Sequence, residues 1–225
     1  MAESIRVVAF DLYGTLIDVD ALVDALRQYT PMPEAACAAW RQRQLQLSNA
    51  ASSGRYMDFD RITFTALHEI APRFHMKLDP SSTKALIDAW AALPPYDDVV
   101  PALKSAAKSM VPMVVLTNAV AHTARNALAH ASIGDFFSHL FSADAVKTFK
   151  PRSAVYEQIL TLGVAPSEVL FVSSNDWDAM GARQAGFHTV WCNRRRAVLS
   201  PKPERTIDDL YALERVLSEY ALTAF

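Results

Sequence analysis

Polar side chains that directly follow short apolar runs are the residues of this sequence that could carry out chemistry. Asp11 follows the run Ile5–Phe10, and Gly14 and Thr15 come shortly after it. A carboxylate can act as a nucleophile that forms a covalent intermediate and splits one difficult step into two easier ones. A glycine-containing loop allows backbone amides to converge beside such a carboxylate. The structural alternative is that Asp11 caps a loop while Gly14 makes a turn.

Three further groups of polar residues have a comparable placement. Thr117 and Asn118 follow the run Met113–Leu116, and Lys150 stands before a proline that suits a helix start. The run Val169–Val172 is followed by Ser173, Ser174, Asn175, Asp176, Trp177 and Asp178. Taken singly, such residues are more often caps or turn residues. A chance coincidence of all four groups in this order is much less common, so their occurrence together favours a functional site.

The elements that must position these groups can be predicted from the apolar runs, which are typical of strands buried on both faces of a parallel sheet. The runs are Ile5–Phe10, Met113–Leu116, Val169–Val172, Thr189–Cys192 and the less clearly marked His139–Ser142. Helical patterns lie between them at Pro101–Ser109, Thr123–Ala131, Ala154–Leu162 and Asp178–Gly186. This alternation predicts an α/β fold with a doubly wound parallel sheet, whose active site lies at the carboxyl ends of the strands.

A long segment without a convincing strand interrupts this alternation between Leu16 and Tyr96. Its helical patterns cover Val19–Tyr29, Pro33–Ser48, Phe59–Ile70 and Ser82–Leu93. We therefore expect an all-helical cap, residues 16–96, inserted after the first strand of a catalytic core formed by residues 1–15 and 97–225. A helical bundle beside a sheet is a common way to form a cleft. The apolar spacing in Thr206–Tyr220 predicts a C-terminal helix that packs on the sheet.

Composition restricts the class of protein. The 225 residues carry a formal net charge of −2 without a dense basic stripe, so no nucleic-acid partner is indicated. We interpret the short cluster Arg194–Arg196 as a solvated loop. Cys37 and Cys192 form neither a disulfide framework nor a metal motif, and the six histidines show no ligand-like spacing. No segment reaches the roughly 20 apolar residues of a membrane span, and we expect a cytoplasmic protein.

The polar motifs resemble those of the haloacid dehalogenase superfamily. The superfamily pattern consists of D-x-x-G-T-L at Asp11, a hydroxyl residue and Asn after the next strand, Lys-Pro, and a later acidic motif. Four longer motifs are similar to those of type II L-2-haloacid dehalogenases: F-D-L-Y-G-T-L from Phe10, W-R-Q-R-Q-L from Trp40, G-R-Y-x-D-F from Gly54 and F-V-S-S-N-D-W-D-A-M-G-A-R from Phe171. Together they span nearly the whole chain. The resemblance implies a Rossmann-like core with a helical cap, and a hydrolase that acts on carbon–halide bonds.

The resemblance also implies a mechanism. Asp11 would displace halide from C2 of an L-2-haloalkanoic acid with inversion, and water would then hydrolyse the aspartyl ester to a D-2-hydroxy acid. The catalytic residues would be Asp11, Thr15, Lys150, Tyr156, Ser173, Asn175 and Asp178. In this assignment Thr15 orients Asp11, and Lys150 holds the carboxylates in position.

The second carboxylate of the assignment is Asp178. The resemblance implies that Asp178, held by Ser173 and Asn175, activates the hydrolytic water. Tyr156 would hydrogen-bond within the same cluster. The alternative for Tyr156 is that it only packs in a helix.

Binding of the substrate and of the halide product would require two anion sites. For the carboxylate, the resemblance implies the Thr117 hydroxyl and the amides of Leu12 and Tyr13; the family usually has Ser at the position of Thr117. For the halide, it implies Arg41 and the Asn118 amide. An arginine beside a tryptophan on a helix is more often a surface residue, so this role of Arg41 depends on the resemblance.

An apolar wall around the alkyl group of the substrate would come from Leu45, Phe59 and Trp177. Arg41 and Leu45 are four residues apart and share one face of the expected helix. Ordinary core packing is the alternative for all three wall residues.

One departure from the superfamily phosphatases separates two enzyme classes. Phosphatases carry a second Asp two positions after the nucleophile, where this chain has Tyr13. A halide leaves as a stable anion and needs no proton, so the loss of this acid suits dehalogenation. We expect no metal and no other cofactor. Asp176 is an additional acid that leaves a metal site open, although it could simply cap a helix or point to solvent.

Two other functions remain as alternatives at this stage. The chain could be a Mg²⁺-dependent phosphatase that acts on a small ester, or a catalytically inactive family member that serves as a binding module. Retention of Asp11, Lys150 and Asp178 argues against the inactive member. Because family members are often homodimers, we also expect a symmetric homodimer.

Overall fold

Six parallel strands form the sheet in the part of the chain that the computed structural model describes, residues 4–198 and 203–222. The strands are β1 (Val7–Phe10), β2 (Met113–Thr117), β3 (His139–Ser142), β4 (Val169–Ser173), β5 (His188–Cys192) and β6 (Arg205–Ile207). Their order is β3-β2-β1-β4-β5-β6. All residues of β1, β2 and β4 are buried, which is why these runs contain apolar residues without alternation. The predicted α/β fold with a parallel sheet is confirmed.

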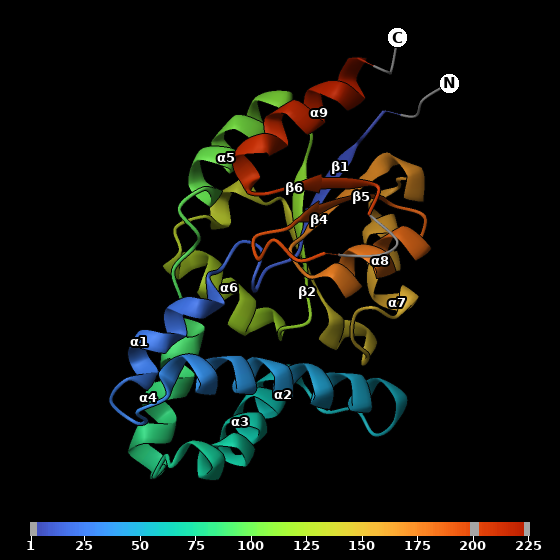
Figure 1. Ribbon diagram of the computed structural model, residues 1–225. Coiled ribbons are helices and arrows are strands. Elements are labelled where there is room, and N and C mark those ends of the chain that lie inside the picture. The colour runs from blue at the N-terminus through green and yellow to red at the C-terminus, as the bar shows by residue number, and fades with distance from the viewer. Residues whose placement is uncertain (1–3, 199–202, 223–225) are drawn as a thin grey trace.

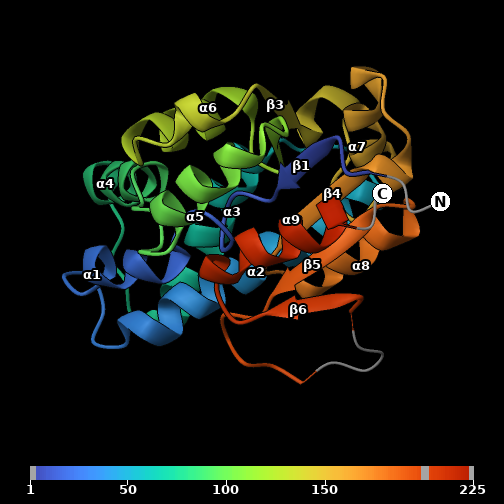
Figure 2. The same cartoon turned by 90° about the horizontal axis from the view of Figure 1, so that it is seen from above.

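Helices cover both faces of the sheet (Figures 1 and 2). One face carries α5 (Val99–Ala106), α6 (Ala121–His130) and α9 (Leu213–Leu222), and the other carries α7 (Ser153–Tyr156) and α8 (Asp176–Gln184). This two-sided covering removes the central strands from water. The core of the molecule therefore lies around β1, β2 and β4.

Four helices between β1 and β2 lie below the carboxyl ends of the strands (Figure 1). They are α1 (Leu22–Leu26), α2 (Pro33–Ser53), α3 (Phe59–Ile70) and α4 (Pro80–Ala91). Local signals define their starts, since Asp58 caps α3 and Asp79 forms a capping box with Ser82 at α4. We call α1–α4 the cap helices. Their division from the core as a separate domain, residues 16–96, stays a prediction.

The two chain segments that connect the sheet to the cap helices run side by side. The Tyr96 amide donates to the carbonyl of Leu16 at 3.1 Å, and the Asp18 amide donates to the carbonyl of Pro94 at 2.8 Å. Within the cap helices, the indole nitrogen of Trp40 on α2 donates to the carbonyl of Thr63 on α3 at 2.9 Å. The hydrogen bonds between the two connecting segments, and the one between α2 and α3, hold the cap helices next to the carboxyl ends of the strands.

Several predicted elements differ in detail from the structure. The expected helix Val19–Tyr29 is a 3-10 helix at Val19–Ala21 followed by α1, and the expected helix Pro101–Ser109 is the end of α5 followed by a 3-10 helix at Ala107–Ser109. The start of the expected C-terminal helix, Thr206–Tyr220, is instead the end of strand β6, and the helix α9 begins only at Leu213. The expected helix Ala154–Leu162 is α7 followed by a 3-10 helix at Glu157–Leu162. The three residues of β6 are too few to show a strand pattern. Among the described residues, no helix is long and apolar enough to cross a membrane.

Candidate active site

Asp11 follows β1 directly, in the middle of the sheet, and only 5% of its surface is exposed. Its Oδ1 accepts a hydrogen bond from Lys150 Nζ at 2.7 Å. Its Oδ2 accepts from Thr15 Oγ1 at 2.9 Å and from Asn175 Nδ2 at 2.8 Å. Thr15 is itself fixed, because its Oγ1 accepts from the Ser174 amide at 2.8 Å. Charged and neutral donors thus hold both oxygens of a buried carboxylate in one orientation.

Lys150 joins Asp11 to the second carboxylate of the site. Its ammonium lies 2.7 Å from Asp178 Oδ2 and also donates to the Leu116 carbonyl at 3.0 Å. The Lys150 side chain is 1% exposed and that of Asp178 is fully buried. Burial lowers the pKa of Lys150, but the ion pairs with Asp11 and Asp178 outweigh it and raise that pKa overall. Lys150 is therefore a permanent cation between two carboxylates.

Asp178 lies in the first turn of α8 and has two further hydrogen-bond donors. Ser173 Oγ donates to its Oδ2 at 3.0 Å, and the Tyr156 hydroxyl donates to its Oδ1 at 2.7 Å. Burial raises the pKa of the Asp178 carboxyl to about 6, although Lys150 acts in the opposite direction and Asp11 adds to the rise. A carboxylate of this pKa is ionised at neutral pH and is basic enough to accept a proton from water.

Gly181 allows α8 to come close to the segment that carries Lys150. A Cβ atom on Gly181 would lie 2.6 Å from the Pro151 Cβ and 2.6 Å from the Tyr156 hydroxyl. Any side chain there would push apart the helix of Asp178 and the residues that contact it. The sequence prediction did not include Gly181, although its position inside the last motif is a signal that could have indicated it.

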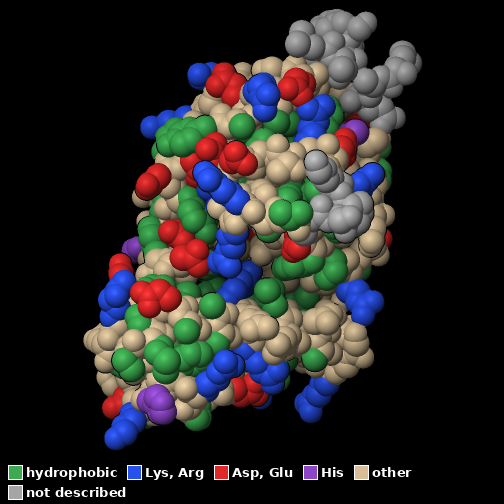
Figure 3. Space-filling model, viewed as in Figure 1, with side chains coloured by type: hydrophobic (Ala, Val, Ile, Leu, Met, Phe, Trp, Pro, Cys, Tyr) green, Lys and Arg blue, Asp and Glu red, His purple; other side chains and the backbone are tan. Residues whose placement is uncertain are grey.

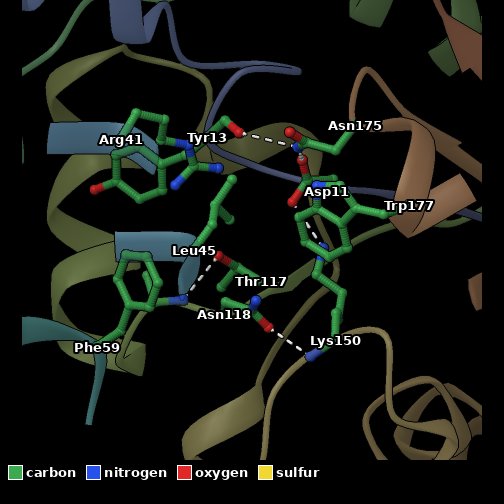
Figure 4. Close-up of a pocket in the computed structure, with 11 residues that line it drawn as sticks. Asp11, Tyr13, Arg41, Leu45, Phe59, Thr117, Asn118, Lys150, Asn175 and Trp177 are labelled. Atoms are coloured by element: carbon green, nitrogen blue, oxygen red, sulfur yellow. Dashed lines mark hydrogen bonds and ion pairs between the residues drawn. The ribbon is translucent and has the colours of Figure 1, made fainter. Parts of the chain in front are cut away.

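A small pocket lies in front of Asp11, between the sheet and α2 (Figure 4). We call it the Asp11 pocket; its lining residues are Asp11, Tyr13, Arg41, Leu45, Phe59, Thr117, Asn118, Ala119, Lys150, Asn175 and Trp177. Its free volume is about 10 Å³, which corresponds to about one water molecule. The pocket in this conformation is closed, and a ligand larger than water requires side chains or cap helices to move apart.

All but one of the residues predicted to bind the substrate lie together around the Asp11 pocket. The lining includes all of those predicted for binding except Leu12, whose side chain is fully buried in the core. Tyr13 lines the pocket, and its ring stacks on Trp90 with centroids 4.9 Å apart. Leu45 and Trp177 are half-buried, whereas Phe59 is 3% exposed and packs edge-on against Phe149.

Several hydrogen-bond donors in this region have no partner within residues 4–198 and 203–222. The amides of Leu12 and Tyr13 donate no hydrogen bond there, and neither does the Asn118 side-chain nitrogen, although Asn118 Oδ1 accepts from the Lys150 amide at 2.8 Å. The Thr117 Oγ1 accepts from the Ala119 amide at 3.1 Å, which leaves its own proton available. Buried donors without partners are rare in proteins, so such a set indicates an anion site.

Arg41 extends from α2 toward the same pocket (Figure 4). In the described part of the chain its guanidinium makes no hydrogen bond or ion pair, unlike that of Arg194. Burial lowers the pKa of Arg41, and the Asp11 carboxylate partly offsets this effect. A half-buried cation without a protein counter-ion favours a bound anion.

Asn175 has a different contact from the one predicted. It was expected to hold Asp178, but its side chain donates to Asp11 Oδ2, and it touches Ser173 only through its amide, at 3.1 Å. Asn175 is the N-cap residue of α8 and lies between that helix and β1, so its side chain reaches the nucleophile. Besides Lys150, the side chains that donate to Asp178 are Ser173 and Tyr156.

Arg194 is a residue of the site that sequence reasoning assigned wrongly. It was interpreted as part of a solvated loop, yet its side chain is 13% exposed and forms a two-pronged ion pair with Asp98 at 2.8 and 2.9 Å. Its Nη2 also donates to the Thr15 carbonyl at 2.9 Å, and its guanidinium lies 4.0 Å from the ring centre of Tyr96. Arg194 therefore fixes the loop that carries Asp11.

The donor set does not fit a resident metal ion. Magnesium prefers oxygen ligands in octahedral geometry, whereas the Asp11 oxygens face an ammonium, a hydroxyl and an amide nitrogen. Residues 4–198 and 203–222 contain no group of three His, Cys, Asp or Glu side chains that could hold a metal. Asp176 does not line the Asp11 pocket; its Oδ1 accepts from the Trp177 amide at 2.7 Å, at the start of α8.

Known proteins are similar to this chain in sequence and in fold. The sequence profile of the haloacid dehalogenase-like hydrolases matches residues 5–186, and the chain belongs to this family. It is 39% identical over 222 residues to (S)-2-haloacid dehalogenase 2 of Pseudomonas sp. strain CBS-3, across 96% of this chain and 97% of that protein. It is 38% identical to (S)-2-haloacid dehalogenase H-109 of Pseudomonas putida, across 92% and 96%. The resemblance found from the motifs is confirmed.

A solved structure agrees with these sequence relatives. The L-2-haloacid dehalogenase of Xanthobacter autotrophicus with chloropropionic acid covalently bound superposes with a TM-score of 0.85 at 30% identity, covering 95% of this chain and 98% of that one. The fold is thus that of an L-2-haloacid dehalogenase.

Proposed function

We propose that this chain hydrolyses L-2-haloalkanoic acids to D-2-hydroxy acids through a covalent ester on Asp11, without a metal ion. The observation that carries the proposal is the Asp11 carboxylate itself, which is oriented by Lys150, Thr15 and Asn175 in a closed pocket beside the unpaired Arg41. The named activities of the relatives support the same reaction.

In the first step an Asp11 oxygen attacks C2 of the substrate from the side opposite the halogen. A bond forms between this oxygen and C2, the carbon–halogen bond breaks, and the halide leaves with the bonding electrons, so that the stereocentre inverts. The fixed orientation of Asp11 supplies the alignment that a displacement reaction needs. Because a halide is a stable anion, the step needs no acid, which agrees with Tyr13 at the position of the phosphatase acid.

In the second step water attacks the carbonyl carbon of the Asp11 ester. Asp178 takes a proton from this water, and the bond between the carbonyl carbon and the oxygen that links it to C2 then breaks. This oxygen, which came from Asp11, takes the proton from Asp178 and leaves as the hydroxyl of the D-2-hydroxy acid, while the second proton of the water is released from the Asp11 carboxyl. Asp178 is suited to this task because it shares Lys150 with Asp11 and has a pKa of about 6. Asp11 returns to its carboxylate form, and the complete reaction releases one halide and one proton.

Two anion sites would hold the substrate during these steps. The unpartnered amides of Leu12 and Tyr13, together with the Thr117 hydroxyl, would bind its carboxylate. Arg41 and the Asn118 side-chain nitrogen would hold the departing halide.

The alkyl group of the substrate would lie against Leu45, Phe59 and Trp177, which form the apolar part of the lining. A small alkyl group in this position would contact the half-buried side chains of Leu45 and Trp177.

The first test is halide release from L- and D-2-chloropropionate in the presence of EDTA. Chloride from the L form alone, with D-lactate as the product, is the expected result. The Asp11→Asn variant should fold and release nothing, and it is the matched control for the nucleophile. Phosphate-ester hydrolysis that requires added Mg²⁺, without chloride release, would replace the proposal with the phosphatase alternative.

The covalent step has its own test. A single turnover in ¹⁸O-labelled water should place the label in Asp11, because water attacks the ester carbonyl and not C2. Mass spectrometry of the peptide that contains Asp11 measures this directly. Label found only in the hydroxy acid would exclude the ester and would indicate direct attack of water.

Localisation and assembly belong to the same proposal. We expect a cytoplasmic homodimer, since the composition suits a reduced compartment and the family resemblance implies dimers. Light scattering after size exclusion, at several protein concentrations, tests the assembly state.

A further inference from the structure

A second cavity adjoins the Asp11 pocket. Its volume is about 410 Å³, and it shares Arg41, Leu45, Asn175 and Trp177 with the pocket. We call it the outer cavity; its other lining residues include Asp20, Asp176, Arg194 and Arg195. Because four side chains line both cavities, the outer cavity lies directly beside the Asp11 pocket.

Arginine side chains from two parts of the chain line the outer cavity. Arg41 stands at its boundary with the Asp11 pocket, while Arg194 and Arg195 come from the loop after β5. The guanidinium of Arg194 is paired with the Asp98 carboxylate, whereas that of Arg41 has no protein partner in the described residues. Figure 3 shows Lys and Arg side chains above a hollow between the cap helices and the rest of the molecule.

The ion pair that Arg195 forms with Asp20 competes only weakly with the binding of an incoming anion. Its Nη2 lies 3.0 Å from Asp20 Oδ1, and the two side chains are 69% and 62% exposed. Exposed ion pairs of this kind contribute little free energy, because water screens them and the long side chains lose freedom. A ligand carboxylate can therefore replace Asp20 at small cost.

A third cavity also reaches the Asp11 pocket but has a different character. It measures about 270 Å³ and is lined by Leu45, Ser48, Asn49, Lys150, Pro151 and Trp177. The only cation among these residues is Lys150, whose ammonium is taken up by two carboxylates. We call it the side cavity. It offers no charge that would attract an anion.

We propose that the outer cavity is the access chamber through which a small carboxylate anion reaches Asp11, and that Arg195 captures the anion and passes it to Arg41. This inference rests on the proposed function, since a 2-haloacid is such an anion. Asp20 and Asp176, which line the same cavity, oppose the capture by repulsion. Apart from Arg41, which receives the anion, the chamber thus has one cation that attracts it, Arg195, and two carboxylates that repel it, Asp20 and Asp176.

The first experiment measures kcat and KM for L-2-chloropropionate with charge variants of the chamber. Arg195→Ala should lower kcat/KM about two- to fivefold at low salt and leave kcat unchanged, because one charge at this range changes the local anion concentration by that factor. The difference should disappear as the salt rises from about 20 to about 500 mM, where the Debye length falls to a few ångströms. Arg196→Ala is the matched control, since Arg196 is exposed on the same loop and does not line the cavity.

Removal of the opposing acids should have the reverse effect. Asp20→Asn frees Arg195, and Asp176→Asn removes a negative charge from the chamber, so each variant should raise kcat/KM at low salt. Equal losses in Arg195→Ala and Arg196→Ala would mean that only overall charge matters, and would overturn the proposal. So would a large loss in Asn49→Trp, which fills the side cavity, combined with no loss in Arg195→Ala.

A second readout does not require turnover. Trp177 lines all three cavities and is half-buried, while the other three tryptophans, Trp40, Trp90 and Trp191, are at most 4% exposed. Quenching of tryptophan fluorescence by iodide therefore reports anions that reach Trp177, and Trp177→Phe identifies this signal. Arg195→Ala should reduce quenching by iodide and leave quenching by neutral acrylamide unchanged. An unchanged iodide signal would overturn the access chamber, even where the wild-type protein releases no halide and the proposed function itself fails.

Discussion

Asp11 and Asp178 share a single counter-ion, because Lys150 Nζ lies 2.7 Å from an oxygen of each. One ammonium cannot neutralise two carboxylates, and all three groups are nearly excluded from water. The surplus negative charge makes the site receptive to a proton, and Asp178, with burial as the main cause, has its pKa raised to about 6. The same arrangement keeps Asp11 beside a cation throughout the reaction.

The first prediction concerns pH. Since Asp178 must be ionised to take a proton from water, the rate of ester hydrolysis should be constant at high pH and fall at acid pH. The fall should lie at or below the pKa of about 6 of the free site, because esterification removes the Asp11 charge that adds to this pKa. Steady-state kcat from about pH 4 to about pH 9 measures this acid limb, a range of about two units or more on either side of that pKa. A kcat that does not fall at acid pH would mean that Asp178 is not the base.

The Tyr156→Phe variant should move this limb. The Tyr156 hydroxyl donates to Asp178 Oδ1 at 2.7 Å and thereby stabilises the ionised form. Loss of a hydrogen bond to a charged group costs about 1.5 kcal/mol, which corresponds to about one pKa unit. We therefore expect the acid limb of kcat to shift upward by about one unit, whereas a purely structural role of Tyr156 would lower kcat without a shift. Thermal melting confirms that the variant is folded.

The second prediction concerns Lys150→Met. The variant leaves two buried carboxylates without their cation, and breaking a buried pair in this way costs about 3–5 kcal/mol of unfolding free energy at neutral pH. Unpaired carboxylates have raised pKa values in the folded state, so they bind protons at a higher pH than in the unfolded chain. The difference in unfolding free energy between Lys150→Met and the wild type should therefore become smaller as the pH falls toward about 4. Urea unfolding at several pH values measures it, and a deficit independent of pH would contradict the shared counter-ion.

Part of this site could be predicted from the chain because several functional residues stand at the carboxyl ends of buried strands. Asp11, Thr117 and Ser173 follow or end three adjacent strands of the sheet, so a reading of apolar runs was sufficient to bring them together. The position of Arg41 on α2 came from the family resemblance, because helical periodicity cannot say which face of a helix meets a sheet.

The residues that escaped prediction act through partners distant in sequence. Arg194 pairs with Asp98 and with the Thr15 carbonyl, and nothing in the run of three arginines distinguishes it from Arg195 or Arg196. The contact between Asn175 and Asp11 likewise depends on how α8 meets β1. Strand β6 was missed because three edge residues carry too little periodicity.

The third prediction concerns Gly181→Ala. Alanine should stabilise an isolated helix by up to about 1 kcal/mol relative to glycine. Here its Cβ would lie 2.6 Å from the Pro151 Cβ and from the Tyr156 hydroxyl, so we expect a net loss of about 1–3 kcal/mol from overpacking. Gly134→Ala is the control, since the nearest atom to its Cβ would be 3.9 Å away. Denaturant unfolding compares the two, and an unaffected Gly181→Ala would show that α8 can move away from Pro151 without cost.

The fourth prediction separates a cation held for function from one held for structure. Arg41 makes no protein contact through its charge in the described residues, whereas Arg194 forms a two-pronged pair with the buried Asp98. Arg41→Leu should therefore leave the unfolding free energy within about 1 kcal/mol of the wild type, or raise it, because a half-buried charge without a partner is removed. Its kcat/KM for halide release should fall at least about tenfold, as expected for the loss of one charged transition-state contact.

Arg194→Leu, unlike Arg41→Leu, should mainly lower the unfolding free energy. It leaves Asp98 buried, with the Leu210 amide at 2.7 Å as its one remaining donor among the described residues, and it frees the Thr15 carbonyl. Because one partner of a buried ion pair is lost, the unfolding free energy should fall by about 3–5 kcal/mol. Urea unfolding and halide release, measured on the same two preparations, test the contrast. Similar losses of stability in both variants would mean that Arg41 has a structural counter-ion after all, and that its charge is not reserved for a ligand.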